Sequence, residues 1–141
     1  MTAPPIPDAV TAALARYPGP VQARLLDIRA MIFEVAEATP GVGLLTETLK
    51  WGEPAYLTEA SRSGSTIRLG TVRSAPDAGA VLLNCRTTLV EEFRDQFADC
   101  LTFDGTRAIV LPRAGPLPHQ TLEICLRAAL TYHRRKGAAA G

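Results

Sequence analysis

The spacing of apolar residues divides the chain into a helical first third, a strand-rich middle and a closing helix. Apolar residues from Val21 to Val35 recur at alternating intervals of four and three, which places them on one face of a helix. A similar stripe predicts a shorter helix after Pro7. Pro18-Gly19-Pro20 separates the two helices, because proline removes backbone donors and restricts the residue before it. Met31 interrupts the polar face of the longer helix, where it could mark a partner contact.

The middle of the chain reads mainly as strands. Residues 42–50 fit a short helix through their leucines and a strand through their alternating threonines, and we expect the helix. Alternating patterns predict strands over residues 54–58, 66–72 and 80–86. The last of these places Asn84 and Arg86 on one side of the sheet.

The last third combines a short helix, a hairpin and a long helix. Thr88-x-x-Glu91 has the pattern of a capping box that starts a helix. Asp104-Gly105 tolerates positive φ and predicts a hairpin between residues 100–103 and 106–111. From about His119 to Arg135, helical spacing predicts a final helix whose stripe includes His133.

These elements predict an α+β fold in a single compact domain. We expect a mainly antiparallel sheet of about five strands, packed by two N-terminal helices, one inserted helix and a C-terminal helix. The domain would span residues 8–136, with flexible termini at residues 1–7 and 137–141.

Composition narrows the functional classes. The 141 residues include 15 basic and 14 acidic side chains, and a net charge of +1 argues against binding of nucleic acid. Three cysteines without C-x-x-C spacing favour neither disulfides nor zinc, and we expect all three to be core thiols. No signal-peptide pattern or 18-residue apolar run occurs, so we expect a cytoplasmic protein without membrane contact.

The chain lacks the motifs of common enzymes. Neither a G-x-S-x-G elbow, a phosphate-binding glycine loop nor an H-E-x-x-H pair is present. An enzyme that uses His133 or Tyr132 as acid or base stays an alternative, but a semi-buried, hydrogen-bonded His133 is favoured because no orienting partner can be placed. We therefore expect no cofactor and favour a module without catalysis.

One stretch concentrates unusual residues: Leu49-Lys50-Trp51-Gly52-Glu53-Pro54-Ala55-Tyr56 holds the only tryptophan. Trp51 could fill the gap between helix and sheet, which we favour because large aromatic residues are usually core. Alternatively, Trp51 and Tyr56 wall a pocket whose ligand is small and anionic, bound by arginines of the sheet. The candidate ligand-binding residues are Lys50, Trp51, Glu53, Tyr56, Arg68, Asn84, Arg86, Arg107 and His133.

The same stretch carries a family resemblance. Together with Tyr17-Pro18-x-Pro20-Val21 and Leu25-Leu26-x-Ile28-Arg29, it resembles the domain of unknown function 1801 family, the YdhG-like domains, over about residues 15–135. The resemblance implies a compact α+β fold with an antiparallel sheet packed by helices. It implies no established activity for most members.

The resemblance also implies a second function, because some relatives are described as frataxin-like intracellular iron chaperones. An iron-donating surface would need a ridge of exposed carboxylates, whereas the first two helices mix their acidic residues with arginines. The leading hypothesis is a binding module for a small molecule or a protein partner. We expect a monomer or a weak homodimer.

Overall fold

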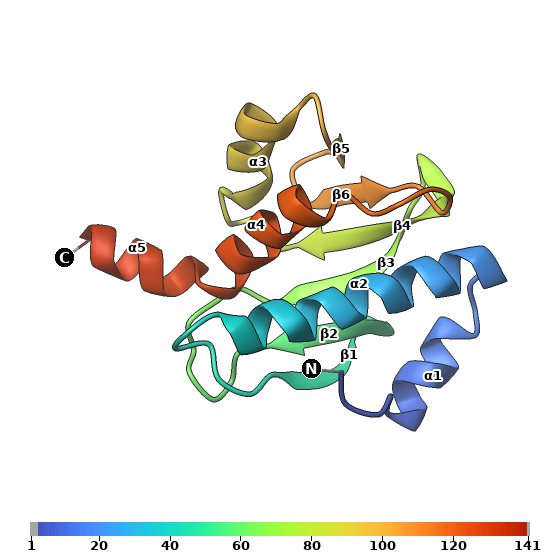
Figure 1. Ribbon diagram of the computed structural model, residues 1–141, viewed down its shortest axis with the longest axis horizontal. Coiled ribbons are helices and arrows are strands. Elements are labelled where there is room, and N and C mark those ends of the chain that lie inside the picture. The colour runs from blue at the N-terminus through green and yellow to red at the C-terminus, as the bar shows by residue number, and fades with distance from the viewer. Residues whose placement is uncertain (1–2, 141) are drawn as a thin grey trace.

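One antiparallel sheet organises the protein (Figure 1). The computed structural model describes the backbone of residues 3–140 and the side chains of residues 3–136. The strands follow the order β1-β2-β3-β4-β6-β5 across the sheet. Their bounds are β1 Thr46–Lys50, β2 Glu53–Leu57, β3 Ile67–Val72, β4 Ala75–Leu83, β5 Thr102–Asp104 and β6 Ala108–Leu111.

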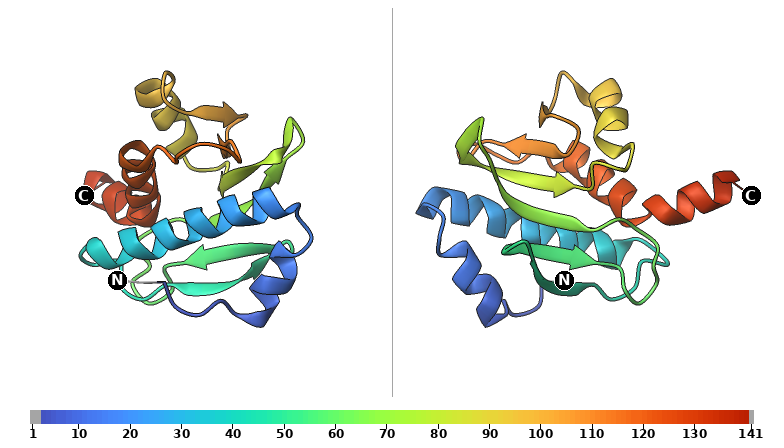
Figure 2. Two further views of the ribbon diagram at one scale, coloured as in Figure 1. Left: turned by 45° about the vertical axis from the view of Figure 1, so that its right-hand side comes forward. Right: turned by 180° about the vertical axis from the view of Figure 1, so that it is seen from behind.

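Within residues 3–140, five helices complete the fold, namely α1 Asp8–Leu14, α2 Gly19–Ala38, α3 Leu89–Phe97, α4 His119–Leu130 and α5 Tyr132–Ala140. Both α2 and α4 lie on one face of the sheet, which we call the inner face, and seen from behind the strands lie in front of them (Figure 2). The predicted single α+β fold is confirmed, and the described part of the chain forms six strands where about five were expected.

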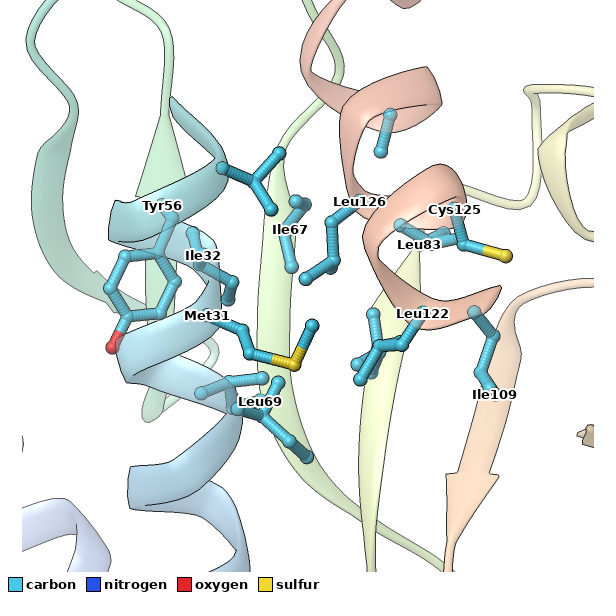
Figure 3. Close-up of a cluster of buried hydrophobic side chains, with 14 of the residues drawn as sticks. Met31, Ile32, Tyr56, Ile67, Leu69, Leu83, Ile109, Leu122, Cys125 and Leu126 are labelled. Atoms are coloured by element: carbon cyan, nitrogen blue, oxygen red, sulfur yellow. The ribbon is translucent and has the colours of Figure 1, made fainter. Parts of the chain in front are cut away.

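The main core fills the space between the inner face and the helices (Figure 3). The predicted stripe of α2 is buried there, and each such aliphatic side chain contributes roughly 1.5–3 kcal/mol. Met31 belongs to this core, because α2 packs against α4 as well as the sheet. The expectation of an exposed Met31 was therefore wrong. The core includes Leu25, Ile28, Met31, Ile32, Ile67, Leu69, Leu122 and Leu126.

The helix predicted over residues 42–50 is instead a strand. Thr46–Lys50 forms β1 at the edge of the sheet and pairs with β2, with Lys50 opposite Glu53. Pairing with β2 supplies the backbone hydrogen bonds that an isolated helical turn would have made internally. The alternating threonines were thus the correct signal, and Leu44, counted toward a helical stripe, is 85% exposed.

Several local predictions need correction. The predicted β5–β6 hairpin forms, but three residues, Gly105 to Arg107, connect its strands rather than two. Thr88 precedes α3 as predicted, yet its hydroxyl lies 2.6 Å from a Glu92 carboxylate oxygen and the capping box does not form. Strand β4 ends at Leu83, so Asn84 and Arg86 lie in the turn that follows.

The closing helix is divided at Thr131, which separates α4 from α5. The break removes His133 from the apolar stripe of α4 and leaves it exposed, contrary to the expected semi-buried position. Cys85 and Cys100 are also exposed, and only Cys125 is the core thiol that was expected of all three.

The chain ends were expected to be flexible. At the C-terminus α5 continues to Ala140, while residues 1, 2 and 141 lie outside the described residues. Within the described range, no helix combines the length and apolar character needed to span a bilayer.

Candidate functional site

The tip of the β1–β2 hairpin presents the only tryptophan to solvent. Trp51 is 89% exposed, so the expectation that it fills the core was wrong. Trp51 and Gly52 are the two connecting residues, and both have positive φ, +56° and +76°. This conformation matches the right-handed twist of a hairpin, but it is strained for a bulky side chain. On the α1 side, Arg16 Nη2 donates a hydrogen bond to the Gly52 carbonyl oxygen at 2.5 Å.

Glu53 lies next to this tip, on the sheet face that no helix within residues 3–140 covers (Figure 2), and we call this the outer face. Its carboxylate accepts a hydrogen bond from Arg68 Nη1 at 2.6 Å, with both side chains 20% exposed. The carboxylate lies over Gly70, where any larger residue would collide with it. A glycine at this position of β3 thus makes room for the ion pair.

Burial raises the pKa of the Glu53 carboxyl, and three arginines oppose the shift. Arg68 has the largest lowering effect on the pKa, followed by Arg107 and Arg16. The pKa of Tyr17 is raised by burial and by the charge of Glu53. Tyr17 therefore lies close enough to Glu53 for their charges to interact, and both residues belong to segments that carry the family resemblance.

Around Glu53 the cationic residues form a surface that we call the basic face. Lys50 stands opposite Glu53 in the strand register, and four cations against one carboxylate give the group a formal charge of +3. Beneath the adjoining part of the outer face, Ala80, Leu82 and Ala108 pack together as a small buried cluster. The basic face consists of Arg16, Lys50, Glu53, Arg68 and Arg107.

Tyr56 does not belong to this surface. Its ring is fully buried on the inner face, and its hydroxyl donates to Glu47 Oε2 at 2.8 Å. Burial and the neighbouring Glu47 carboxylate raise the pKa of Tyr56, so the phenol stays protonated. The prediction that Tyr56 lines a pocket with Trp51 was wrong, since Tyr56 is fully buried whereas Trp51 is 89% exposed at the hairpin tip.

Sequence reasoning missed a buried ion pair beneath Tyr56. Arg29 and Glu47 side chains are 5% and 7% exposed, and the guanidinium donates to both carboxylate oxygens, at 2.6 and 2.8 Å. Arg29 Nη2 also donates to the Pro4 carbonyl at 2.8 Å, and its guanidinium stacks 4.9 Å from the Phe33 ring centroid. Had residues 46–50 been recognised as a strand, alternation would have placed Glu47 on the inner face.

The remaining predicted site residues lie apart from the basic face. Asn84 accepts a hydrogen bond from the Arg86 amide at 2.9 Å, which is a local turn contact. His133 lies on α5, toward the opposite end of the molecule from the hairpin tip (Figure 1). Its neighbour Tyr132 is buried and accepts a hydrogen bond from the Thr88 amide.

The basic face lies outside two cavities found among the described residues. These cavities have volumes of about 730 and 380 Å³, and neither is lined by a residue of the basic face or by Trp51. Among residues 3–136, no group of three or more His, Cys, Asp or Glu side chains is arranged to hold a metal ion.

Comparisons with known proteins identify a related fold among solved structures. No family model and no curated protein matches the sequence significantly. Among solved structures, a protein of the DUF1801 family from Bacillus subtilis, YdhG, matches with a TM-score of 0.58 and 18% sequence identity. The match covers 86% of this chain and 87% of that one, and it confirms the YdhG-like fold that the sequence resemblance predicted.

Proposed function

We propose that this YdhG-like domain is a non-catalytic module that binds an acidic protein surface on its basic face, with Trp51 as the apolar anchor. The observation that carries the proposal is the state of Trp51, which is 89% exposed and held at a positive φ. Left-handed backbone geometry costs a non-glycine residue about 1 kcal/mol, and in the free protein the exposed ring makes no packing contacts within residues 3–136 that would compensate for this cost. Contact of the ring with a partner would compensate for the cost, since tryptophan is prominent among interface hot spots.

Charge favours an acidic partner. The basic face has a formal charge of +3, and Arg107 makes no side-chain hydrogen bond or salt bridge within residues 3–136. Arginine pairs with carboxylates in a planar, two-pronged geometry, which makes it well suited to acidic side chains. Arg68 could exchange its bond to Glu53 for one to a partner carboxylate.

Shape favours a protein over a small molecule at this place. Ala80 and Ala108 are fully buried beneath this face, and its residues line neither the cavity of about 730 Å³ nor that of about 380 Å³. Small ligands are usually enclosed in a concave site, whereas protein interfaces combine a central aromatic residue with a polar rim. The small anionic ligand predicted from sequence is thus the less favoured occupant.

The alternative functions gain no support. His133 is exposed on α5 and carries no side-chain hydrogen bond within the described residues, so no acid–base pair is assembled around it. The iron-chaperone alternative has no metal-binding group of three or more His, Cys, Asp or Glu side chains to support it within residues 3–136.

The test is a titration of ¹⁵N-labelled protein with two acidic polymers, poly-L-glutamate and a copolymer of glutamate and tyrosine. We expect amide shifts at residues 50–53, 67–70 and 107–108, and tighter binding of the copolymer because tyrosine can cover Trp51. Arg107→Glu should weaken binding of both polymers about fivefold or more. Arg113→Glu, in the exposed connection before α4, is the matched control.

Trp51→Ala separates the anchor from the charges. This variant should keep its affinity for poly-L-glutamate and lose the preference for the copolymer. The proposal is wrong if Arg107→Glu weakens binding no more than Arg113→Glu does. It is also wrong if the shifted amides belong to the basic segment from His133 to Lys136.

A further inference from the structure

A second surface lies at the other end of β1 from Trp51. The cavity of about 730 Å³ opens between the C-terminal half of α2 and the connection that leads into β1. Its volume falls within the range of small-ligand sites. Its lining includes Pro4, Phe33, Ala36, Glu37, Leu44 and Leu45.

One wall of this cavity is held rigidly by the buried ion pair. Phe33 lies edge-on to the Tyr56 ring at 5.6 Å and under the Arg29 guanidinium at 4.9 Å. Both of those side chains are fixed by Glu47. A wall that is already ordered loses little conformational freedom when a ligand packs against it.

The rim of the cavity has apolar side chains that are exposed to water. Leu44 is 85% exposed even though it lines the cavity with Leu45 and Pro4. Ligand atoms that cover Leu44 would remove this surface from water and gain roughly 25 cal/mol per Å². The body of a ligand is therefore apolar.

The charge around the cavity favours a cation. Glu37 is the only ionisable residue in the lining, and it forms no salt bridge within residues 3–136. The last turn of α2 adds the negative end of the helix dipole. Arg134 approaches from α5, but its guanidinium donates to the Pro40 carbonyl at 2.9 Å and does not line the cavity.

We propose that this cavity binds a small amphiphilic amine. Its apolar body lies between Phe33 and Leu45 and covers Leu44, and its ammonium group pairs with the Glu37 carboxylate. Three features together assign this ligand class, namely solvent-exposed apolar surface, an aromatic wall held by its neighbours, and a carboxylate that has no salt-bridge partner within residues 3–136. The site is separate from the basic face, and it does not depend on the protein-binding function proposed above.

Three probes of similar size and different charge test the proposal, namely 2-phenylethylamine, 2-phenylethanol and 3-phenylpropionate. Binding is followed by amide shifts in ¹⁵N-labelled protein at residues 33–45. We expect the order amine, alcohol, carboxylate, with the amine about threefold tighter than the alcohol, as one partly exposed ion pair allows.

Variants assign the two parts of the ligand. Glu37→Gln should remove the advantage of the amine and leave the alcohol unchanged, whereas Glu34→Gln, one turn earlier and outside this lining, should change neither. Leu44→Ser, at an exposed position that the fold does not need, should weaken all three probes. Tightest binding of the carboxylate, an amine advantage that survives Glu37→Gln, or no shifts at residues 33–45 at millimolar probe would each overturn the proposal.

Discussion

Substitution of Glu47 by Gln should cost the protein a large part of its stability. The change keeps the shape of the side chain but removes the negative charge that Arg29 faces in a site where both side chains are less than 8% exposed, at 5% and 7%. A guanidinium that stays behind has the Pro4 and Pro5 carbonyls and the Phe33 ring as its remaining partners. A buried charge left with so little compensation is strongly unfavourable.

The magnitude follows from this geometry. Breaking a buried ion pair by removing one partner costs about 3–5 kcal/mol, and we expect the lower end, since the Gln carbonyl can still accept from Arg29 or Tyr56. A loss of about 3 kcal/mol is a substantial share of the roughly 5–15 kcal/mol that stabilises a domain. For a chain of this length it corresponds to a decrease in Tm of roughly 6–12 °C.

Urea unfolding followed by circular dichroism measures the effect. The matched control is Glu123→Gln, which removes an ion pair to Arg127 whose side chains are both 47% exposed, and it should cost about 0.5 kcal/mol or less. The double variant Arg29→Met and Glu47→Met should recover part of the loss, because no buried charge remains unpaired. If Glu47→Gln and Glu123→Gln lower the free energy of unfolding equally, the buried pair has no special energetic role.

Three further results are expected. Trp51→Gly should have a free energy of unfolding in urea that equals the wild-type value or exceeds it by up to about 1 kcal/mol, because glycine adopts positive φ without strain. A clear loss of stability would contradict this. In the native protein, a thiol reagent should modify Cys85 and Cys100 but reach Cys125 only after unfolding, since burial raises the pKa of Cys125 to about 12; three fast thiols would be inconsistent. The pKa of Glu53 is raised in the folded state, so the charged carboxylate lowers the stability of the protein above that pKa. At about pH 7, Glu53→Gln should therefore be at least as stable as the wild type. The free energies of unfolding of the two proteins should converge as the pH falls through the folded-state pKa.

Sequence reasoning was most successful where structure is determined locally. The stripe of α2 and the hairpin at Gly105 depend on residues that are close together in the sequence, and both were recognised, although the hairpin connection is one residue longer than predicted. Residues 42–50 were assigned wrongly because their leucines and threonines support two periods. Pairing with β2 decides between them, and that contact is made by tertiary structure.

The candidate site was predicted in part for the same reason. Lys50, Arg68 and Arg107 lie near the Glu53 carboxylate, although binding by these four residues stays a prediction. Arg16 could not have been found from sequence, because its contact with Gly52 spans 36 positions. Trp51 was predicted to lie in the core because large aromatic residues are usually buried. The prediction was wrong because Trp51 lies at the tip of a hairpin, where its side chain is 89% exposed.

The exposed position of Trp51 also determines what its fluorescence can report. A ring that is 89% exposed is already surrounded by water, so unfolding should change its emission little. Burial of the same ring by a partner would shift the emission to shorter wavelength and protect it from iodide quenching. In this chain the only tryptophan is therefore a poor probe of folding and a direct optical probe of occupancy at the hairpin tip.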